Sequence, residues 1–263
     1  MMKKIAVVLT FAAIGLLLAA GVQAETVRGE GRYMSNKLTH LMPFKAVEVR
    51  GDAEVDIWQR DMQSVTVSGK SNLVALADLR VENETLIIDF KRPVHVKGTH
   101  ALHVAVSTMS LENITVHGQG RVRVRGSFDT PQLTLMAGND ASIDGDLLKA
   151  DMLRVQATNK ADVDLERMQV KKLEVGTFDK AEVELSGSAE QAQLINNSSK
   201  DLEASSLRVT DAHVQINGSG DVEIFATKTL KAEALGSGKI TYHGRPMLTR
   251  SGSEKHIRPA FED

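Results

Sequence analysis

A three-residue turn signature recurs about every twenty residues through the C-terminal half of the chain. The copies are Gly138-Asn139-Asp140, Thr158-Asn159-Lys160, Phe178-Asp179-Lys180, Ser198-Ser199-Lys200, Gly218-Ser219-Gly220 and, after a shorter step, Gly236-Ser237-Gly238. An outlying copy, Gly118-Gln119-Gly120, precedes the series by the same step. A fixed period of this size indicates one supersecondary unit stacked on copies of itself, each unit burying the apolar face of its neighbour.

Apolar residues alternate with polar ones on both sides of each turn, which predicts two strands per repeat. Leu153-Arg154-Val155 precedes one turn and Val163-Asp164-Leu165 follows it, while Met168 with Val170 suggests a third side. Copies with identical spacing stack in register, so we predict an all-β fold, a right-handed parallel β-helix or solenoid with about 20 residues per rung. An antiparallel sandwich of evenly spaced strands is the alternative, and the strict step favours the solenoid.

The same pattern sets the domain boundaries. Residues 44–246 are predicted to form a single solenoid domain, irregular to about residue 110 and built of regular rungs over 111–246. Residues 25–43 are expected to cap or fray from the first rung, and the polar segment 247–263 is expected to be disordered. Asn83-Glu84 lies between two apolar runs and is interpreted as a hairpin turn.

Residues 1–24 have the three parts of a signal peptide. Lys3 and Lys4 form the basic start, residues 5–18 form the apolar stretch, and Val22-Gln23-Ala24 supplies a small-residue cleavage site, with cleavage after Ala24. An uncleaved membrane anchor is the competing interpretation, but the stretch is short against the about 20 residues that span a bilayer. We therefore expect an exported protein with no transmembrane segment after cleavage.

The amino-acid composition excludes several covalent modifications and one class of partner. The chain has no cysteine, so neither disulfides nor a lipid-bearing N-terminal cysteine is expected. Loss of Lys3 and Lys4 with the signal leaves 30 Lys and Arg against 34 Asp and Glu. Such a mixed, weakly acidic surface does not attract polyphosphate, so nucleic acid is not an expected partner.

Charged residues also recur with the period of the turns. Lys160, Lys180 and Lys200 form one row, and two neighbouring columns are acidic. The acidic columns are Asp144 with Asp164 and Glu184, and Ser142 with Asp162 and Glu182. The simpler interpretation is a solvated face whose oppositely charged columns keep the rungs in register. The functional hypothesis is that the lysine row docks an anionic glycan or a partner protein.

Stacked carboxylates also raise the possibility of catalysis. Acids on adjacent rungs lie near the separation that retaining glycosidases use, so a carbohydrate-active β-helix enzyme using Asp164 or Glu184 is the alternative function. We expect these acids to face solvent with nothing to raise their pKa. Aromatic residues are scarce, and no aromatic or arginine column is expected that could bind a sugar ring. No catalytic residue and no cofactor is therefore predicted.

Histidine, glycine and tryptophan positions receive structural interpretations. His100 and His103 are three apart in a strand and should face opposite sides, so no metal site is predicted. Turn glycines are expected to supply positive φ angles. Trp58 should point outward and pack on a neighbouring rung, because Val55 and Ile57 take the buried face.

The end of the repeat resembles a known family. Asn217-Gly218-Ser219-Gly220-Asp221 and Tyr242-His243-Gly244-Arg245-Pro246 are similar to the Gly-Ser-Gly-Asp turns and the closing Tyr-x-Gly-x-Pro segment of the bacterial autotransporter-adhesin head GIN domain family. The resemblance spans roughly residues 44–246, and Thr158-Asn159-Lys160 and Phe178-Asp179-Lys180 depart from its glycine pattern. It implies an exported β-helical domain and carries no established catalytic residues.

These observations together predict a non-enzymatic, exported β-solenoid that acts as an interaction or scaffold module of the bacterial cell envelope, adhesin-like in its contacts. The expected partner is an envelope protein or a glycan. The sequence stops shortly after the solenoid, without the β-barrel translocator of an autotransporter. We therefore expect the periplasm before the cell surface or the medium.

Overall fold

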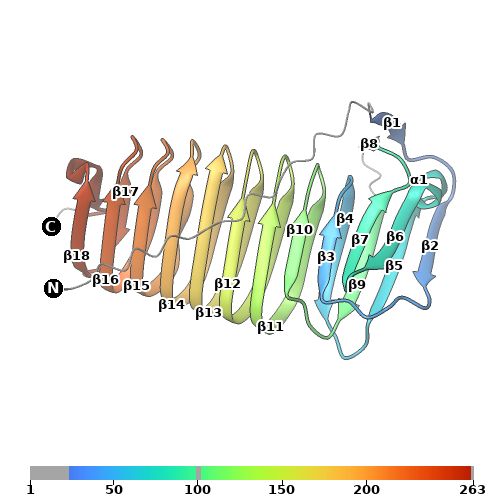
Figure 1. Ribbon diagram of the computed structural model, residues 1–263, viewed down its shortest axis with the longest axis horizontal. Helices are drawn as coiled ribbons and strands as arrows, with labels where there is room; N and C mark the ends of the chain where they lie inside the picture. Colours follow the sequence, from blue (N-terminus) through green and yellow to red (C-terminus); the bar gives the residue numbers. More distant parts are fainter. Residues whose placement is uncertain (1–23, 99–101, 262–263) are drawn as a thin grey trace.

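The computed structural model describes residues 24–98 and 102–261. These residues wind into a β-solenoid of about seven turns that are about 20 residues apart (Figure 1). The predicted fold class is confirmed, while the handedness of the winding stays a prediction. Most of the predicted signal peptide (residues 1–23) and His100 lie outside the described residues.

Six long strands form the regular part of the stack, and each pairs in parallel with the next. They are β11 (Arg121–Ala137), β12 (Ser142–Ala157), β13 (Asp162–Asp179), β14 (Glu182–Ser198), β15 (Leu202–Ile216) and β16 (Val222–Ala234). The turn signatures connect one strand to the next. Each strand has three segments. The first corner is a break in register, as between Leu165 and Met168, and the second is an unpaired residue, as at Lys171. Met168 and Val170 are buried on the short middle segment, in agreement with the third side that the sequence suggested.

Alternating aliphatic side chains fill the narrow interior of the coils. In β13, Val163, Leu165 and Leu173 are fully buried, and equivalent residues of the neighbouring coils lie directly above and below them. Ala161 and Ala181, which directly follow two of the turns, are also buried. Every coil adds such residues to the same core. Each fully buried Val or Leu stabilises the fold by about 1.5–3 kcal/mol.

The turns use two different backbone solutions. Asn139, Asn159 and Asp179, at the middle of their turns, have φ angles of 64°, 61° and 61°. Gly218 and Gly220 do not have positive φ. A Cβ on Gly220 would lie 1.8 Å from the carbonyl oxygen of Lys200, so close backbone approach requires glycine there. The expectation that turn glycines supply positive φ is therefore wrong for Gly218 and Gly220, whereas Gly118 and Gly187, with φ angles of 71° and 119°, bear it out.

The N-terminal part does not wind in sequence order. Strand β3 (Ala46–Val49) lies between β7 (Thr85–Phe90) and β10 (Asn113–Val116), which both come later in the chain. Likewise β4 (Ala53–Gln59) lies between β9 (Leu102–Thr108) and β11. The coil formed by β3 and β4 is thus inserted between two later ones. Trp58 on β4 is half-buried and pairs with Ser107 and Arg125 of the flanking coils.

Antiparallel pairs close the N-terminal end of the stack (Figure 1). On the side of β3, β6 (Ala77–Glu82) forms a hairpin with β7, and Asn83 and Glu84 have φ angles of 48° and 58°, which confirms the predicted hairpin turn. On the side of β4, β2 (Tyr33–Leu38) pairs with β5 (Ser64–Lys70), which pairs with β9. Strand β1 (Glu25–Arg28) pairs with β8 (Val94–Lys97), and α1 (Ser71–Leu76) follows β5.

The C-terminal segment continues the stack instead of being disordered as the sequence suggested. After β17 (Ile240–His243), β18 (Met247–Gly252) pairs in parallel with β16. A short 3-10 helix, η1 (Glu254–His256), leads to β19 (Ile257–Pro259), which pairs with β17. Ile257 is buried in the core. The expectation of disorder is wrong for the described part of this segment, because its few apolar residues are placed in register with the coil before.

Candidate binding surfaces

The lysine row lies where the period placed it, at the same turn of three successive coils. Lys160 Nζ is 3.5 Å from Asp140 Oδ1, and Lys200 Nζ is 3.6 Å from Glu182 Oε2. More than half of each lysine side chain is exposed. Such exposed pairs contribute at most about 1 kcal/mol each, so these ammonium groups could exchange their carboxylate for another anion at small cost.

The acidic column is longer than the sequence suggested. Asp144, Asp164 and Glu184 are in register across β12, β13 and β14, and Glu203 of β15 and Glu223 of β16 continue the line. Partial burial, then the charges of Glu184, Glu166 and Asp144, raise the pKa of Asp164. Partial burial, then the charges of Glu184 and Glu223, raise the pKa of Glu203. The expectation that nothing raises these pKa values is therefore wrong.

Glu174 on β13 has basic neighbours, in contrast to the acids of this column. Only 5% of its side chain is exposed, and it accepts a 2.8 Å bond from Arg154 Nε and lies 2.6 Å from Lys172 Nζ. Burial alone would raise the pKa of this carboxyl, but the hydrogen bonds from Lys172 and Arg154 outweigh it and the pKa is lowered. Glu174 thus ties two adjacent coils together as an ionised group.

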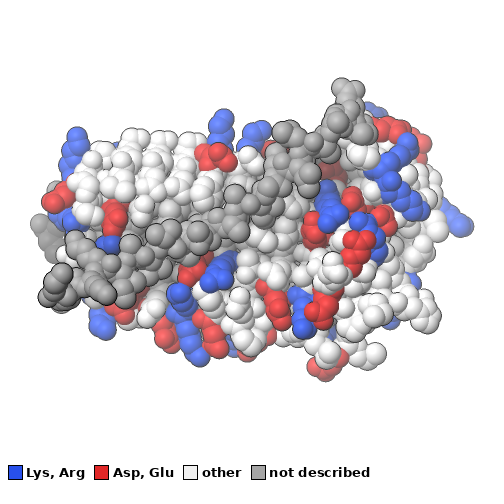
Figure 2. Space-filling model, viewed as in Figure 1, with Lys and Arg blue, Asp and Glu red and all other residues white. Residues whose placement is uncertain are grey.

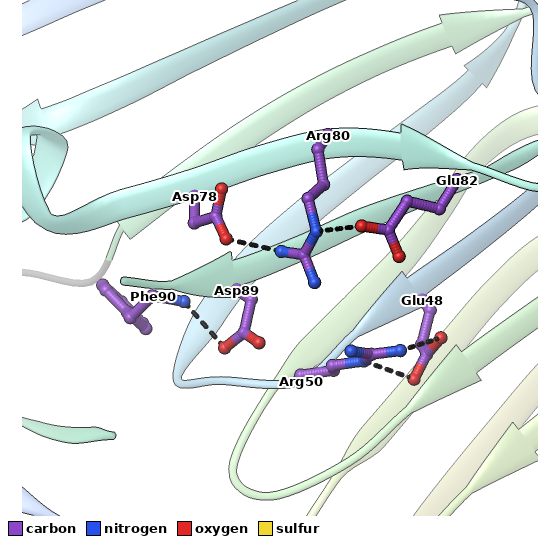
Figure 3. Close-up of polar contacts among 7 residues, drawn as sticks. All are labelled: Glu48, Arg50, Asp78, Arg80, Glu82, Asp89 and Phe90. Atoms are coloured by element: carbon purple, nitrogen blue, oxygen red, sulfur yellow. Dashed lines mark hydrogen bonds and ion pairs between the residues drawn. The ribbon is translucent and has the colours of Figure 1, made fainter. Parts of the chain in front are cut away.

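An ion-pair cluster lies on the outside of β6 and β3, near the N-terminal end of the stack (Figure 3). Arg50 makes a bidentate contact with Glu48, with Nε 2.6 Å and Nη2 3.0 Å from the two carboxylate oxygens. Arg80 on β6 reaches both Asp78 and Glu82. The hydrogen bond to Glu48 raises the pKa of Arg50, and the bond to Glu82 raises that of Arg80. Both guanidinium groups are engaged by carboxylates of the protein, so this cluster is a poor candidate for an anion site.

A groove of about 630 Å³ crosses the stack from β11 to β16 on the side where the long strands bend. Thr130, Ala150, Val170 and Ala189 lie beneath it; they are in register from coil to coil and buried. One wall consists of Asp129, Lys149, Gln169, Ser188 and Arg208, and the other of Pro131, Asp151, Lys171, Glu190 and Thr210. Figure 2 shows acidic and basic side chains interspersed along the lower edge of the molecule, without a large area of one sign.

An aromatic cluster continues the first wall of the groove. Arg208 pairs with Phe225, and Phe225 with His243, along one column. The Arg208 guanidinium lies 4.7 Å from the centre of the Phe225 ring. The rings of Phe225 and His243 stack with centres 6.2 Å apart, and Phe261, 81% exposed, meets His243 edge-on at 6.1 Å.

The sequence interpretation missed this cluster and excluded any aromatic or arginine column, which is a wrong expectation. The sequence does contain a pattern that indicates this cluster. The step of 18 residues from Gly218 to Gly236 also separates Phe225 from His243 and His243 from Phe261. A search with the twenty-residue step passes over these rings, because the last coils are shorter.

Other site types find no support among the residues described. In that part of the chain, no three or more histidines, cysteines or acids come together as metal ligands would. No helix within the described ranges has the length and apolar character needed to cross a bilayer. His103 lies 3.5 Å from Glu54, whose carboxylate is also 2.9 Å from Arg123 Nη2, so its charged neighbours form an ion-pair network.

The stack defines a parallel β-solenoid whose outward side chains form straight columns. The chain belongs to the family described as "Putative auto-transporter adhesin, head GIN domain", whose model matches residues 43–246. Among curated proteins, none matches this chain.

Solved structures share the fold. One from Parabacteroides distasonis, described as a putative lipid binding protein, is 19% identical with a TM-score of 0.82, and covers 90% of this chain and 100% of its own. A putative adhesin from the same species is 21% identical at 0.82, with the same coverage. A putative adhesin from Parabacteroides merdae is 19% identical at 0.79, again over 90% and 100% of the two chains. At these identities the likeness shows the fold alone.

Proposed function

We propose that this chain is a non-enzymatic, exported, adhesin-like module that holds a partner of the bacterial cell envelope along its stack. One observation carries the proposal: side chains at equivalent positions of successive coils are in register, so the surface presents the same geometry again and again. Repetition on a rigid stack converts weak single contacts into avidity. The adhesin names of the family and of two structural neighbours agree with this role.

The proposed compartment is the periplasm first, with the cell surface and the medium as alternatives. The predicted signal peptide supports export. The proposal is tested by protease treatment of intact cells that express the tagged protein, with a known periplasmic protein as control. Protection until the outer membrane is opened is the expected result. Digestion while the control survives would place the stack on the surface, and digestion only after the inner membrane is opened would contradict export.

A second candidate function, a carbohydrate-active enzyme, is favoured by one observation. Asp144 and Asp164 line a shallow hollow of about 410 Å³ together with Arg123 and Arg125, and the pKa of Asp164 is raised. A raised carboxyl pKa is typical of a general acid. The release of reducing ends from envelope polysaccharides, lost in Asp164→Asn and Glu184→Gln, would support this candidate over simple binding.

A further inference from the structure

We propose that the groove across β11–β16 binds a linear, uncharged polysaccharide laid along the axis of the stack, with one end toward the exposed ring of Phe261, which Phe225 and His243 connect to Arg208 of the groove wall. This inference rests on the proposed function and names the class of partner. It assigns the binding to the groove, which the lysine row does not line.

The direction of the ligand follows from register. Gln169 pairs with Lys149 on one side and Ser188 on the other, so the wall side chains succeed one another from coil to coil along the axis. Parallel strands are about 4.8 Å apart. Sugar units of an extended polysaccharide repeat at a similar spacing, so successive units can meet successive coils. An extended peptide matches this spacing less well, because its successive side chains point to opposite sides.

The charge of the groove indicates an uncharged ligand. Its acids are Asp129, Asp151 and Glu190, and its bases are Lys149, Lys171 and Arg208. Three charges of each sign leave no net charge, and Lys171 Nζ already lies 2.6 Å from Asp151. A polyanion would gain little here. Alternating donors and acceptors, with Gln169 and Ser188 between them, suit the many hydroxyl groups of a neutral sugar chain.

The aromatic end supplies the apolar contact that such a chain needs. Ala150, Val170 and Ala189 beneath the groove are buried in the core, so they close it from below without offering an apolar surface. Phe225 is fixed from two sides, by Arg208 and by the stacked ring of His243, which itself contacts Glu223. Phe261 is 81% exposed and meets only the edge-on ring of His243 among the aromatic residues, so most of its ring is available to a sugar, and aromatic side chains are common anchors in ligand sites.

Native gel electrophoresis through polysaccharide tests the inference with the full chain. The probes are two neutral linear chains, hydroxyethyl cellulose and glucomannan, and one anionic chain, polygalacturonate. We expect the protein to be retarded by a neutral chain, with retardation unchanged by added salt. Migration unaffected by both neutral chains, or retardation only by polygalacturonate and abolished by salt, would overturn the inference.

Variants locate the contact. Phe261→Ala and Gln169→Ala should each weaken retardation about fivefold or more, since single anchors carry most of an interface's affinity. Met247→Ala is the matched control for Phe261, because Met247 is 78% exposed at the same end but pairs with Thr229, which does not line this groove. Equal effects of Phe261→Ala and Met247→Ala, or no effect of Gln169→Ala, would overturn the assignment to the groove.

Treatment of isolated envelopes separates this inference from the proposed function. Envelope binding that survives protease but is lost after periodate oxidation of the glycans is the expected result. Binding lost after protease and kept after periodate would overturn the polysaccharide and leave the envelope module standing with a protein partner. Absence of envelope binding before any treatment would count against the proposed function itself.

Discussion

At the residue scale, Asp164 shows how the repeat concentrates like charges. It lies in register between Asp144 and Glu184, and burial with these neighbouring charges raises its pKa. A carboxyl whose pKa is higher in the folded state opposes folding once it is ionised. The cost is absent below the unfolded pKa and complete above the folded pKa.

Asp164→Asn should therefore increase the free energy of unfolding at pH 7 by roughly 0.2–1 kcal/mol, the range for like charges on adjacent strands. The gain should vanish as pH falls below the pKa of the unfolded carboxyl, where both states are protonated. Urea denaturation at neutral and acid pH measures both. Asp151→Asn is the matched control, because Asp151 pairs with Lys171 and its loss should give no gain. If Asp164→Asn were less stable than the parent protein at pH 7, the proposed repulsion at Asp164 would be contradicted.

Two turn glycines of the same signature should differ sharply in their response to alanine. A Cβ at Gly220 would lie 1.8 Å from a backbone oxygen, whereas at Gly138 the nearest atom is the Thr158 hydroxyl at 3.3 Å. Gly220→Ala should cost about 2–3 kcal/mol because the backbone must move, and Gly138→Ala less than about 1 kcal/mol. Thermal and urea denaturation compare the two variants, and equal losses would show that the turns do not stack as described.

At the element scale, the sequence predicted the elements that repeat and missed those that do not. Strands β11–β16 could be predicted because alternation and turn spacing act together over each coil. The insertion of β3 and β4 between later coils leaves no local trace, because β3 matches the repeat equally well beside β7 or β10. The aromatic cluster was missed because Arg208 and Phe225 are brought into register only by a shortened coil. The lysine row was predicted because every member obeys the main period.

The C-terminal coil should be a structural cap. Strands β18 and β19 cover the edges of β16 and β17, and Ile257 completes the core there. A chain truncated after Pro246 should lose at least about 2 kcal/mol of stability, the contribution of one large buried side chain, and should self-associate through the exposed edges. Urea denaturation and size-exclusion chromatography test this. If the truncated chain were a monomer of unchanged stability, the segment would not act as a cap and would behave as a disordered tail.

At the scale of the whole molecule, each coil contacts only its neighbours along the axis, so a coil should be removable without loss of fold. Deletion of residues 161–180 takes out one period and leaves Lys160 joined to Ala181, which preserves the Lys-Ala sequence of the turn. Asp144 would then pair with Glu184 in place of Asp164. The shortened protein keeps the same surface with one repeat fewer.

The most direct test of the central claim, binding along several coils, is cosedimentation of the intact and the shortened protein with isolated bacterial envelopes. Circular dichroism first establishes that both are folded as β-sheet. We predict that the intact protein sediments with the envelopes, and that loss of one coil raises the apparent Kd about tenfold or more, because contacts made at successive coils add up as avidity. Equal binding by two folded proteins, or no binding by the intact one, would contradict the claim.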